Sequence, residues 1–105
     1  MNMAYKLKIS EEARLQLKEI IEYMTLKLRN SKAATDFLNT LEKKYDQLCL
    51  NPEMYEYTND MRLRSLGYRR MPVDNYIVLY LVDKDKTEIQ IDGIFYSKYN
   101  YRNDR

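Results

Sequence analysis

The sequence predicts a single α+β domain in which a two-helix hairpin packs on one face of a small, largely antiparallel sheet. Two helical apolar stripes lie in the first half of the chain, whereas the second half has the alternation and the continuous apolar run that are typical of strands. A chain of 105 residues has room for one core of this kind, so we assign residues 1–105 to one domain. The expected order is strand, helix, helix, strand, strand, strand.

The first three elements follow from local patterns. Residues 5–9 alternate apolar and basic side chains, which predicts a half-buried strand. Ser10 can cap a helix that begins with two glutamates, and the break at 29–31 supplies a second capping residue, Ser31. The second helix is therefore expected to return antiparallel and to end at Pro52. The apolar stripes are Ala13, Leu17, Ile20, Ile21, Met24 and Leu28 on the first helix, and Ala34, Phe37, Leu38, Leu41, Tyr45 and Leu48 on the second.

Three strands are expected after a polar loop. Residues 62–73 are interpreted as one strand that Gly67 interrupts with a bulge or bend. Residues 76–82 form a continuous apolar run rich in β-branched and aromatic side chains, which indicates a central strand covered on both faces. Residues 88–96 alternate again and predict the closing strand of a three-stranded antiparallel meander.

The composition excludes several kinds of site. Histidine is absent, and Cys49 is the only cysteine, so the chain cannot assemble a Ser/His/Asp or Cys/His nucleophilic site or a typical zinc site. Gly67 and Gly93 are the only glycines, which excludes glycine-rich nucleotide-binding loops. We therefore expect neither a metal nor a cofactor. A single cysteine and the lack of an apolar run near 18 residues, about the minimum for a membrane span, predict a cytoplasmic protein with no membrane segment.

Basic side chains are concentrated in the second half of the chain. Residues 1–60 have nine Lys and Arg against ten Asp and Glu, whereas residues 61–105 have nine against six. Four arginines fall within nine residues without an acid: Arg62, Arg64, Arg69 and Arg70. Guanidinium groups bind phosphate or carboxylate in bidentate geometry, so this cluster and Arg102 are our candidates for binding a target. Ion pairs with acids of the same chain, such as Glu53, Glu56 and Asp60, explain the cluster equally well.

The first helix also carries apolar side chains outside its stripe. These are Leu15, Tyr23 and Leu26. A helix with apolar residues beyond its core-facing stripe needs a second contact surface, so we expect these three residues to bind a partner protein.

The order of elements, with the run Gly67–Tyr76 leading into Ile77–Asp83, resembles the RelE/ParE superfamily of type II toxin-antitoxin toxins. The resemblance covers nearly the whole chain and is strongest from Arg62 to Tyr101. It implies a toxin and plasmid-stabilization role, with a cognate antitoxin as partner. RelE-like members are mRNA interferases that cut messenger RNA on the ribosome without a metal, whereas ParE-like members are inhibitors of DNA gyrase. The helical hairpin, about five turns per helix, resembles the ParE branch more closely.

The resemblance also implies roles for individual residues. Arg70 matches a basic position of the RelE-like active strand, and Lys98 and Tyr101 fall where a basic residue and a tyrosine follow the last strand. These three are the candidate catalytic residues. Ile77 stands where RelE-like enzymes have a phosphate-binding arginine, and an isoleucine cannot stabilise phosphate charge. This difference disfavours nuclease activity.

Two other functions stay open. The chain could be a degenerate family member that acts only as an antitoxin-binding module, with an acidic or amphipathic peptide on the helical hairpin or at the sheet edge. It could also be a plain RNA-binding domain, whose affinity would fall steeply with salt. Whether the free chain forms a homodimer is open as well.

Overall fold

The structure, a computed structural model, describes residues 4–98 and has the predicted α+β architecture. One four-stranded sheet has the order β1-β4-β3-β2. The strands are β1 (Lys6–Ile9), β2 (Arg69–Val73), β3 (Tyr76–Asp83) and β4 (Glu88–Tyr96). β1 pairs in parallel with β4, and the other two pairings are antiparallel. The predicted order of the elements and the largely antiparallel sheet are thus confirmed.

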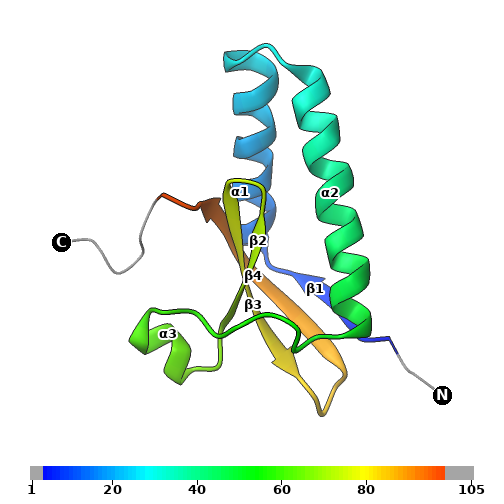
Figure 1. Cartoon of the computed structure of the whole chain (residues 1–105), viewed down its shortest axis with the longest axis vertical. Coiled ribbons are helices and arrows are strands. Elements are labelled where there is room, and N and C mark those ends of the chain that lie inside the picture. The colour runs from blue at the N-terminus through cyan, green and yellow to red at the C-terminus, as the bar shows by residue number, and fades with distance from the viewer. Residues whose placement is uncertain (1–3, 99–105) are drawn as a thin grey trace.

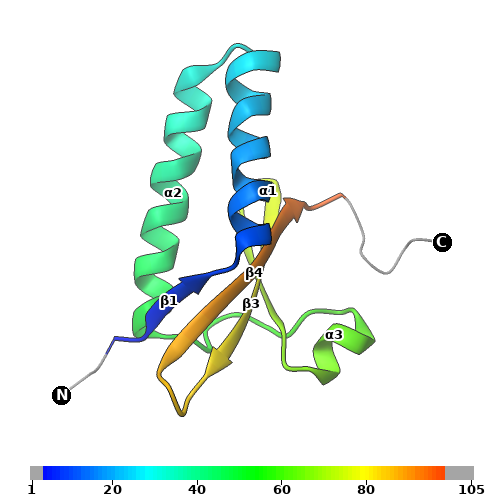
Figure 2. The ribbon, with the colours of Figure 1, turned by 180° about the vertical axis from the view of Figure 1, so that it is seen from behind.

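The two long helices stand side by side as an antiparallel hairpin (Figure 1). Helix α1 (Glu11–Glu22) begins as predicted, because the Ser10 hydroxyl oxygen accepts a 3.0 Å hydrogen bond from the Ala13 amide. It continues into a π-helical turn, η1 (Tyr23–Lys27). Figure 2 shows the hairpin from behind, with its far end extending well past the sheet.

Helix α2 (Ser31–Leu50) is capped by Asn30 and not by Ser31 as the sequence suggested. Arg29 has a φ of 52°, in the left-handed region, and the turn that it makes leaves Asn30 in a non-helical conformation. The side-chain oxygen of Asn30 therefore accepts a 2.9 Å hydrogen bond from the Ala33 amide. The prediction of Ser31 as the cap is wrong, although the antiparallel return is right. Pro52 lies just beyond the helix end, as expected.

The core lies between the helices and one face of the sheet. Alternate residues of the strands face the helices, and most residues of the predicted apolar stripes meet them. The prediction is wrong for Leu28 and Leu38, which are exposed outside the core. The buried side chains at this contact are Phe37, Leu41 and Leu48 from α2, Met71 and Val73 from β2, Val78 and Tyr80 from β3, and Ile89 and Ile91 from β4. β3 lies between two strands and is buried on both faces, as its continuous apolar run predicts.

The segment before β2 differs from the prediction. Residues 61–65 form a short helix, α3 (Met61–Ser65), and not the first part of a strand. The Asp60 carboxylate caps it by accepting a 3.0 Å hydrogen bond from the Leu63 amide, and Gly67 closes the following turn with a φ of 97°. The strand predicted at 62–73 therefore begins only at Arg69. Its outer edge is partly covered by the preceding loop, because the Thr58 amide donates to the Tyr68 carbonyl and the Arg70 amide to the Glu56 carbonyl.

No helix of the described residues is long and apolar enough to cross a bilayer.

Candidate functional site

We call the face of the sheet opposite the helices the second face. Val78 and Tyr80 of β3 belong to the core under the helices, so Ile77 and Leu79 lie on this second face. Ile77 is nonetheless only 5 % exposed. Its cross-strand neighbours are Pro72 and Phe95. Ile77 thus occupies an apolar, covered position.

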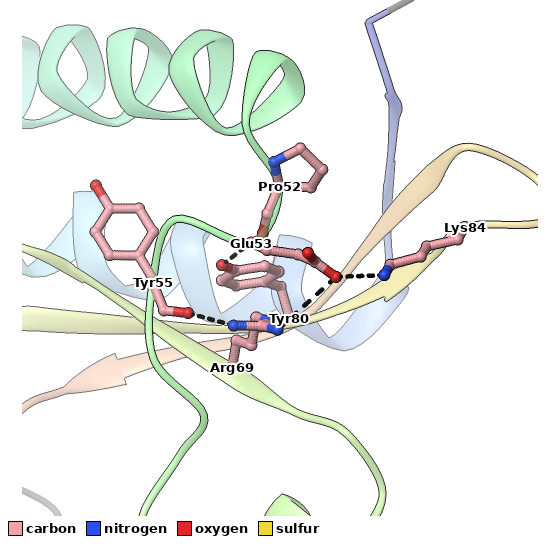
Figure 3. A network of polar contacts seen from close by, with 6 residues as sticks. All are labelled: Pro52, Glu53, Tyr55, Arg69, Tyr80 and Lys84. Atoms are coloured by element: carbon pink, nitrogen blue, oxygen red, sulfur yellow. Dashed lines mark hydrogen bonds and ion pairs between the residues drawn. The ribbon is translucent and has the colours of Figure 1, made fainter.

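Arg69 lies on the helix-facing side of β2, next to Tyr80, and is held within the chain (Figure 3). One guanidinium nitrogen, Nη1, donates a 2.6 Å hydrogen bond to the Tyr55 carbonyl oxygen, and Nη2 lies 4.0 Å from Glu53 Oε2. The guanidinium carbon is 4.0 Å from the centre of the Tyr57 ring, a cation–π contact. Only 12 % of the Arg69 side chain is exposed. Arg69 therefore fastens the loop after α2 to the sheet and does not face an external anion.

Two further contacts hold the same loop (Figure 3). Lys84, in the turn after β3, lies 2.8 Å from Glu53 Oε2, and its hydrogen bond lowers the pKa of the Glu53 carboxyl. The Tyr80 hydroxyl donates a 3.0 Å hydrogen bond to the Pro52 carbonyl, and burial raises the pKa of Tyr80 to about 12. Loop residues 52–57 are thus tied to β2, β3 and the turn that follows β3.

The four clustered arginines occupy three different places. Arg69 lies under the helices, and Arg70 lies on the second face because neighbouring residues of a strand point to opposite sides. Arg62 and Arg64 are exposed on α3, where the Arg64 guanidinium carbon is 5.7 Å from the Tyr57 ring centre. Within residues 4–98, neither Arg62, Arg64 nor Arg70 makes an ion pair. Arg62 and Arg64 therefore lie on a helix and not on the strand expected at 62–73, whereas Arg69 and Arg70 lie on β2.

An open polar groove of about 710 Å³ lies between α3, the second face and the start of α1. Its centre is Asp92, the extra residue of a β-bulge in β4 opposite the Leu79–Tyr80 step. Asp92 Oδ2 accepts a 2.6 Å hydrogen bond from the Tyr68 hydroxyl, and the Gln90 side-chain amide lies 3.0 Å from both oxygens of the same carboxylate. Burial, followed by the bond to Asp92, raises the pKa of Tyr68 to about 12.

The charges of this groove disfavour a phosphate. Three carboxylates line it, those of Glu12, Asp60 and Asp92, against the single cation of Arg62. The negative excess repels an anionic ligand. No three carboxylate or cysteine side chains among the described residues are arranged to hold a metal ion.

Lys98 is exposed in the turn that follows β4. Tyr101 and Arg102, the other two tail candidates, lie outside the described residues. The suggested catalytic set of Arg70, Lys98 and Tyr101 therefore remains a prediction.

The three residues expected to bind a partner are all exposed on the hairpin: Leu15 on α1, and Tyr23 and Leu26 on η1. Beside them a groove of about 850 Å³ runs between α1 and the end of the sheet, with Tyr23, Tyr76 and Tyr96 in its wall. The ring centres of Tyr76 and Tyr96 are 5.7 Å apart in an edge-to-face contact. The hairpin thus presents apolar and aromatic surface that the described part of the chain leaves uncovered.

Sequence reasoning suggested Glu53 as an ion-pair partner of the clustered arginines, and the structure pairs it with Arg69 and Lys84. It missed Tyr68 and Asp92 as contact residues. Asp92 only continues the polar alternation of Glu88 and Gln90, and the following Gly93 is the one local sign of a bulge. Tyr68 gives no signal, because its partner Asp92 is distant in the sequence and becomes a neighbour only when the sheet forms.

Comparisons with known proteins agree with the fold. No curated protein sequence matches the chain. Three solved structures have similar folds: the chromosomal ParDE toxin-antitoxin system from P. aeruginosa, the RelBE2 toxin-antitoxin complex from Mycobacterium tuberculosis, and the isolated RelE toxin from E. coli. The first matches with a TM-score of 0.70 and 16 % identity over 90 % of this chain and 98 % of that one. The second has a TM-score of 0.64 and 16 % identity over 90 % of this chain and 99 % of that one. The third has a TM-score of 0.62 and 15 % identity over 92 % of this chain and 88 % of that one.

The model of one sequence family covers nearly the whole chain. Residues 7–101 match the family described as ParE toxin of type II toxin-antitoxin system, parDE. The matched range includes the helical hairpin, α3 and the complete meander of β2, β3 and β4. The chain therefore belongs to the ParE family of type II toxin-antitoxin toxins.

Proposed function

We propose that this toxin arrests growth in the cytoplasm by binding and inhibiting DNA gyrase, and that it does not cut messenger RNA. The observation that carries the proposal is the covered Ile77 on the second face, at the position where a RelE-like nuclease has its phosphate-binding arginine. Ribonucleolytic attack by a 2′-hydroxyl group requires cations near the phosphate. Arg69 is unavailable for that role because it donates to the Tyr55 carbonyl, and neither cross-strand partner of Ile77 is a cation.

The polar groove supports the same proposal. A message lying on the second face would pass near the carboxylates of Glu12, Asp60 and Asp92. ParE-like relatives act on a protein, and binding a protein requires neither a catalytic cation nor a phosphate site. Arg70 and Lys98 remain the residues of this chain on which a nuclease mechanism would depend.

The antitoxin partner is proposed to cover the exposed side chains of Leu15, Tyr23 and Leu26. They supply apolar anchors on one helix, and a groove with three tyrosines lies beside them. An amphipathic segment of the antitoxin would bury this surface. An antitoxin bound to these side chains would leave α3 and the second face uncovered. The antitoxin and the target would then compete only indirectly.

The test combines expression in cells with a purified assay. The chain is induced without its antitoxin, growth is followed, and transcript ends are mapped during arrest. In parallel, the purified chain is added to gyrase that supercoils a relaxed plasmid. We expect growth arrest, intact transcripts and loss of supercoiling.

Arg70→Ala separates the two mechanisms. A nuclease that uses Arg70 would lose its cutting, whereas gyrase inhibition should persist with this variant. Codon-phased cuts together with unaffected supercoiling would overturn the proposal in favour of the RelE-like mechanism. Unimpaired growth at high expression, with tight binding of the antitoxin, would instead support the degenerate antitoxin-binding module.

A further inference from the structure

Helix α3 carries an exposed surface that the fold itself does not use. We define the α3 surface by Met61, Arg62, Arg64 and Leu66. Met61 is 79 % exposed and Leu66 is 63 % exposed, and both arginines are exposed beside them. Figures 1 and 2 show α3 beside the sheet and apart from the far end of the helical hairpin, and Arg62 shares the polar groove with Glu12 and Gln16 at the start of α1. An antitoxin bound at the far end of the hairpin, on Tyr23 and Leu26, would therefore leave the α3 surface open.

The helix geometry groups these side chains. Successive residues of a helix are about 100° apart, so Met61 lies between Arg62 and Arg64 on the outer side, while Leu63 points to the body of the protein. The burial agrees, because Leu63 is half-buried and its neighbours in α3 are exposed. Two cations thus flank a fully accessible methionine.

Hydrogen bonds fix the segment that carries the α3 surface. The Asp60 carboxylate caps the helix, and the Leu63 carbonyl accepts 3.1 Å hydrogen bonds from the Leu66 and Tyr68 amides. The Tyr68 hydroxyl then binds Asp92 at 2.6 Å and anchors the segment to β4. A surface that is already ordered loses little entropy on binding, which favours affinity.

Within the described residues neither arginine of this surface makes an ion pair, but their surroundings differ. Arg62 also lines the polar groove that Glu12, Asp60 and Asp92 make negative, so those carboxylates weaken its attraction for an anion. Arg64 adjoins the Tyr57 ring, which leaves its hydrogen-bond donors available to an outside acceptor. Arg64, with Arg62 beside it, is therefore the main cation for an acidic partner.

The apolar part of the surface indicates a protein and not a nucleic acid. Single strands of nucleic acid are bound by cations together with aromatic rings that stack on bases. Met61 and Leu66 are aliphatic, and the neighbouring Tyr57 ring is already in contact with Arg64 and Arg69. Exposed methionine is a side chain that adapts to hydrophobic pockets of partner proteins. Large apolar side chains exposed together with arginine are typical of protein interfaces.

We propose that the α3 surface docks this toxin on an acidic protein surface of its target, with Met61 entering an apolar pocket and Arg62 and Arg64 pairing with carboxylates around it. The inference rests on the proposed function, since it assigns the part of the chain that contacts the inhibited protein.

The test reverses the two charges. Arg62→Glu with Arg64→Glu is compared with Lys27→Glu plus Lys43→Glu, a matched control in which two exposed lysines on the helical hairpin undergo the same change of charge. Binding to immobilised gyrase, inhibition of supercoiling and growth arrest are measured for each chain. We expect the α3 variant to bind about tenfold more weakly or worse and to lose growth arrest, and the control to stay within about twofold of the wild type.

Met61→Ala distinguishes the loss of a target contact from a folding defect. The side chain is exposed, so its removal leaves the fold intact, yet we expect about a tenfold loss of target binding if Met61 enters a pocket. Antitoxin binding and the thermal midpoint should be unchanged in Met61→Ala and in the charge-reversed chain. Raising salt should weaken the wild type more than the charge-reversed chain.

The outcomes separate the two proposals. If the wild type inhibits gyrase and the charge-reversed and Met61→Ala chains inhibit it equally well, the α3 inference is wrong and the proposed function stands. If the wild type leaves gyrase active, the proposed function is wrong, and retention of growth arrest by both α3 variants would overturn the inference too. A loss of RNA binding in place of protein binding would also overturn it.

Discussion

The Tyr68 hydroxyl donates a 2.6 Å hydrogen bond to Asp92 Oδ2, which ties the segment after α3 to the last strand of the sheet. Because the acceptor is a carboxylate, we expect Tyr68→Phe to lower the free energy of unfolding by about 1 to 2 kcal/mol. Denaturation in urea measures this loss. Tyr23→Phe, which removes an exposed hydroxyl, is the control and should change stability by less than about 0.5 kcal/mol. Equal urea midpoints for Tyr68→Phe and the wild type would contradict the prediction.

High pH should destabilise the folded chain. Burial raises the pKa of Tyr45, Tyr68 and Tyr80 to about 12, whereas an unfolded tyrosine titrates near its ordinary value of about 10. Between these values the unfolded chain loses protons that the folded chain keeps, so stability is complete below about pH 10 and falls as the pH rises toward 12. Tyrosinate absorbance and unfolding curves at several pH values test this.

Tyr80→Phe supplies the control for the alkaline transition. This variant removes one tyrosine of raised pKa, so its stability should fall less steeply above about pH 10 than that of the wild type. A folded protein in which all three of these tyrosines ionise near their ordinary pKa would contradict the prediction.

The main elements were predictable because their signals are local. The apolar stripes of α1 and α2 and the continuous run of β3 occupy whole elements, so their periods are clear without knowledge of neighbours. α3 was not predictable in the same way, because the run from Arg62 to Leu66 is too short to distinguish a strand from one turn of helix. The helical conformation of this run depends on the Asp60 cap and on the turn at Gly67.

The site was less predictable than the fold. Arg69 and Arg70 are adjacent and chemically identical, yet the strand sends them to opposite faces. What holds Arg69 is the Tyr55 carbonyl, a backbone group that no sequence pattern distinguishes. Exposure of Leu15, Tyr23 and Leu26, in contrast, followed from their positions outside the core stripe and is confirmed.

Arg69 and Arg70 should respond differently to mutation. We expect Arg69→Ala to lower the free energy of unfolding by about 2 to 3 kcal/mol, because it removes the bond to Tyr55 and the contact with the Tyr57 ring. Arg70→Ala should cost less than about 0.5 kcal/mol, since the Arg70 side chain has no ion pair with any residue from 4 to 98. Chemical denaturation of both variants measures the difference.

This contrast affects how loss of toxicity is interpreted. A weaker toxin after Arg69→Ala should correlate with a smaller folded population, and Arg69→Lys should restore only part of the stability because an ammonium group lacks the planar fork of the guanidinium. An Arg69→Ala chain as stable as the wild type would show that the contacts of Arg69 contribute nothing to the fold.

Ile77 should behave as a packing residue. We expect Ile77→Val to cost about 0.5 to 1.5 kcal/mol and Ile77→Ala about 2 to 4 kcal/mol, as for other buried isoleucines. Unfolding curves give both values. A functional surface residue would instead change toxicity at constant stability, and that result would contradict the description of the second face given above.

The exposed side chains on the hairpin give the most direct test of the antitoxin surface. Leu15→Asp with Leu26→Asp should leave the free energy of unfolding within about 0.5 kcal/mol of the wild type, because neither side chain is in the core. Burial of two leucines is worth about 1.5 to 3 kcal/mol each, so we expect the affinity for the antitoxin to fall about 100-fold or more. Isothermal titration with the purified antitoxin measures it.

Leu50→Asp is the matched control for this pair. Leu50 is as exposed as Leu26 but lies at the far end of α2, away from the α1 and η1 side chains of the proposed surface. Its substitution should leave antitoxin affinity within about twofold, because no contact is expected there. If Leu50→Asp weakened binding as much as the double variant, or if the double variant bound like the wild type, the antitoxin would have to occupy a different face of the hairpin.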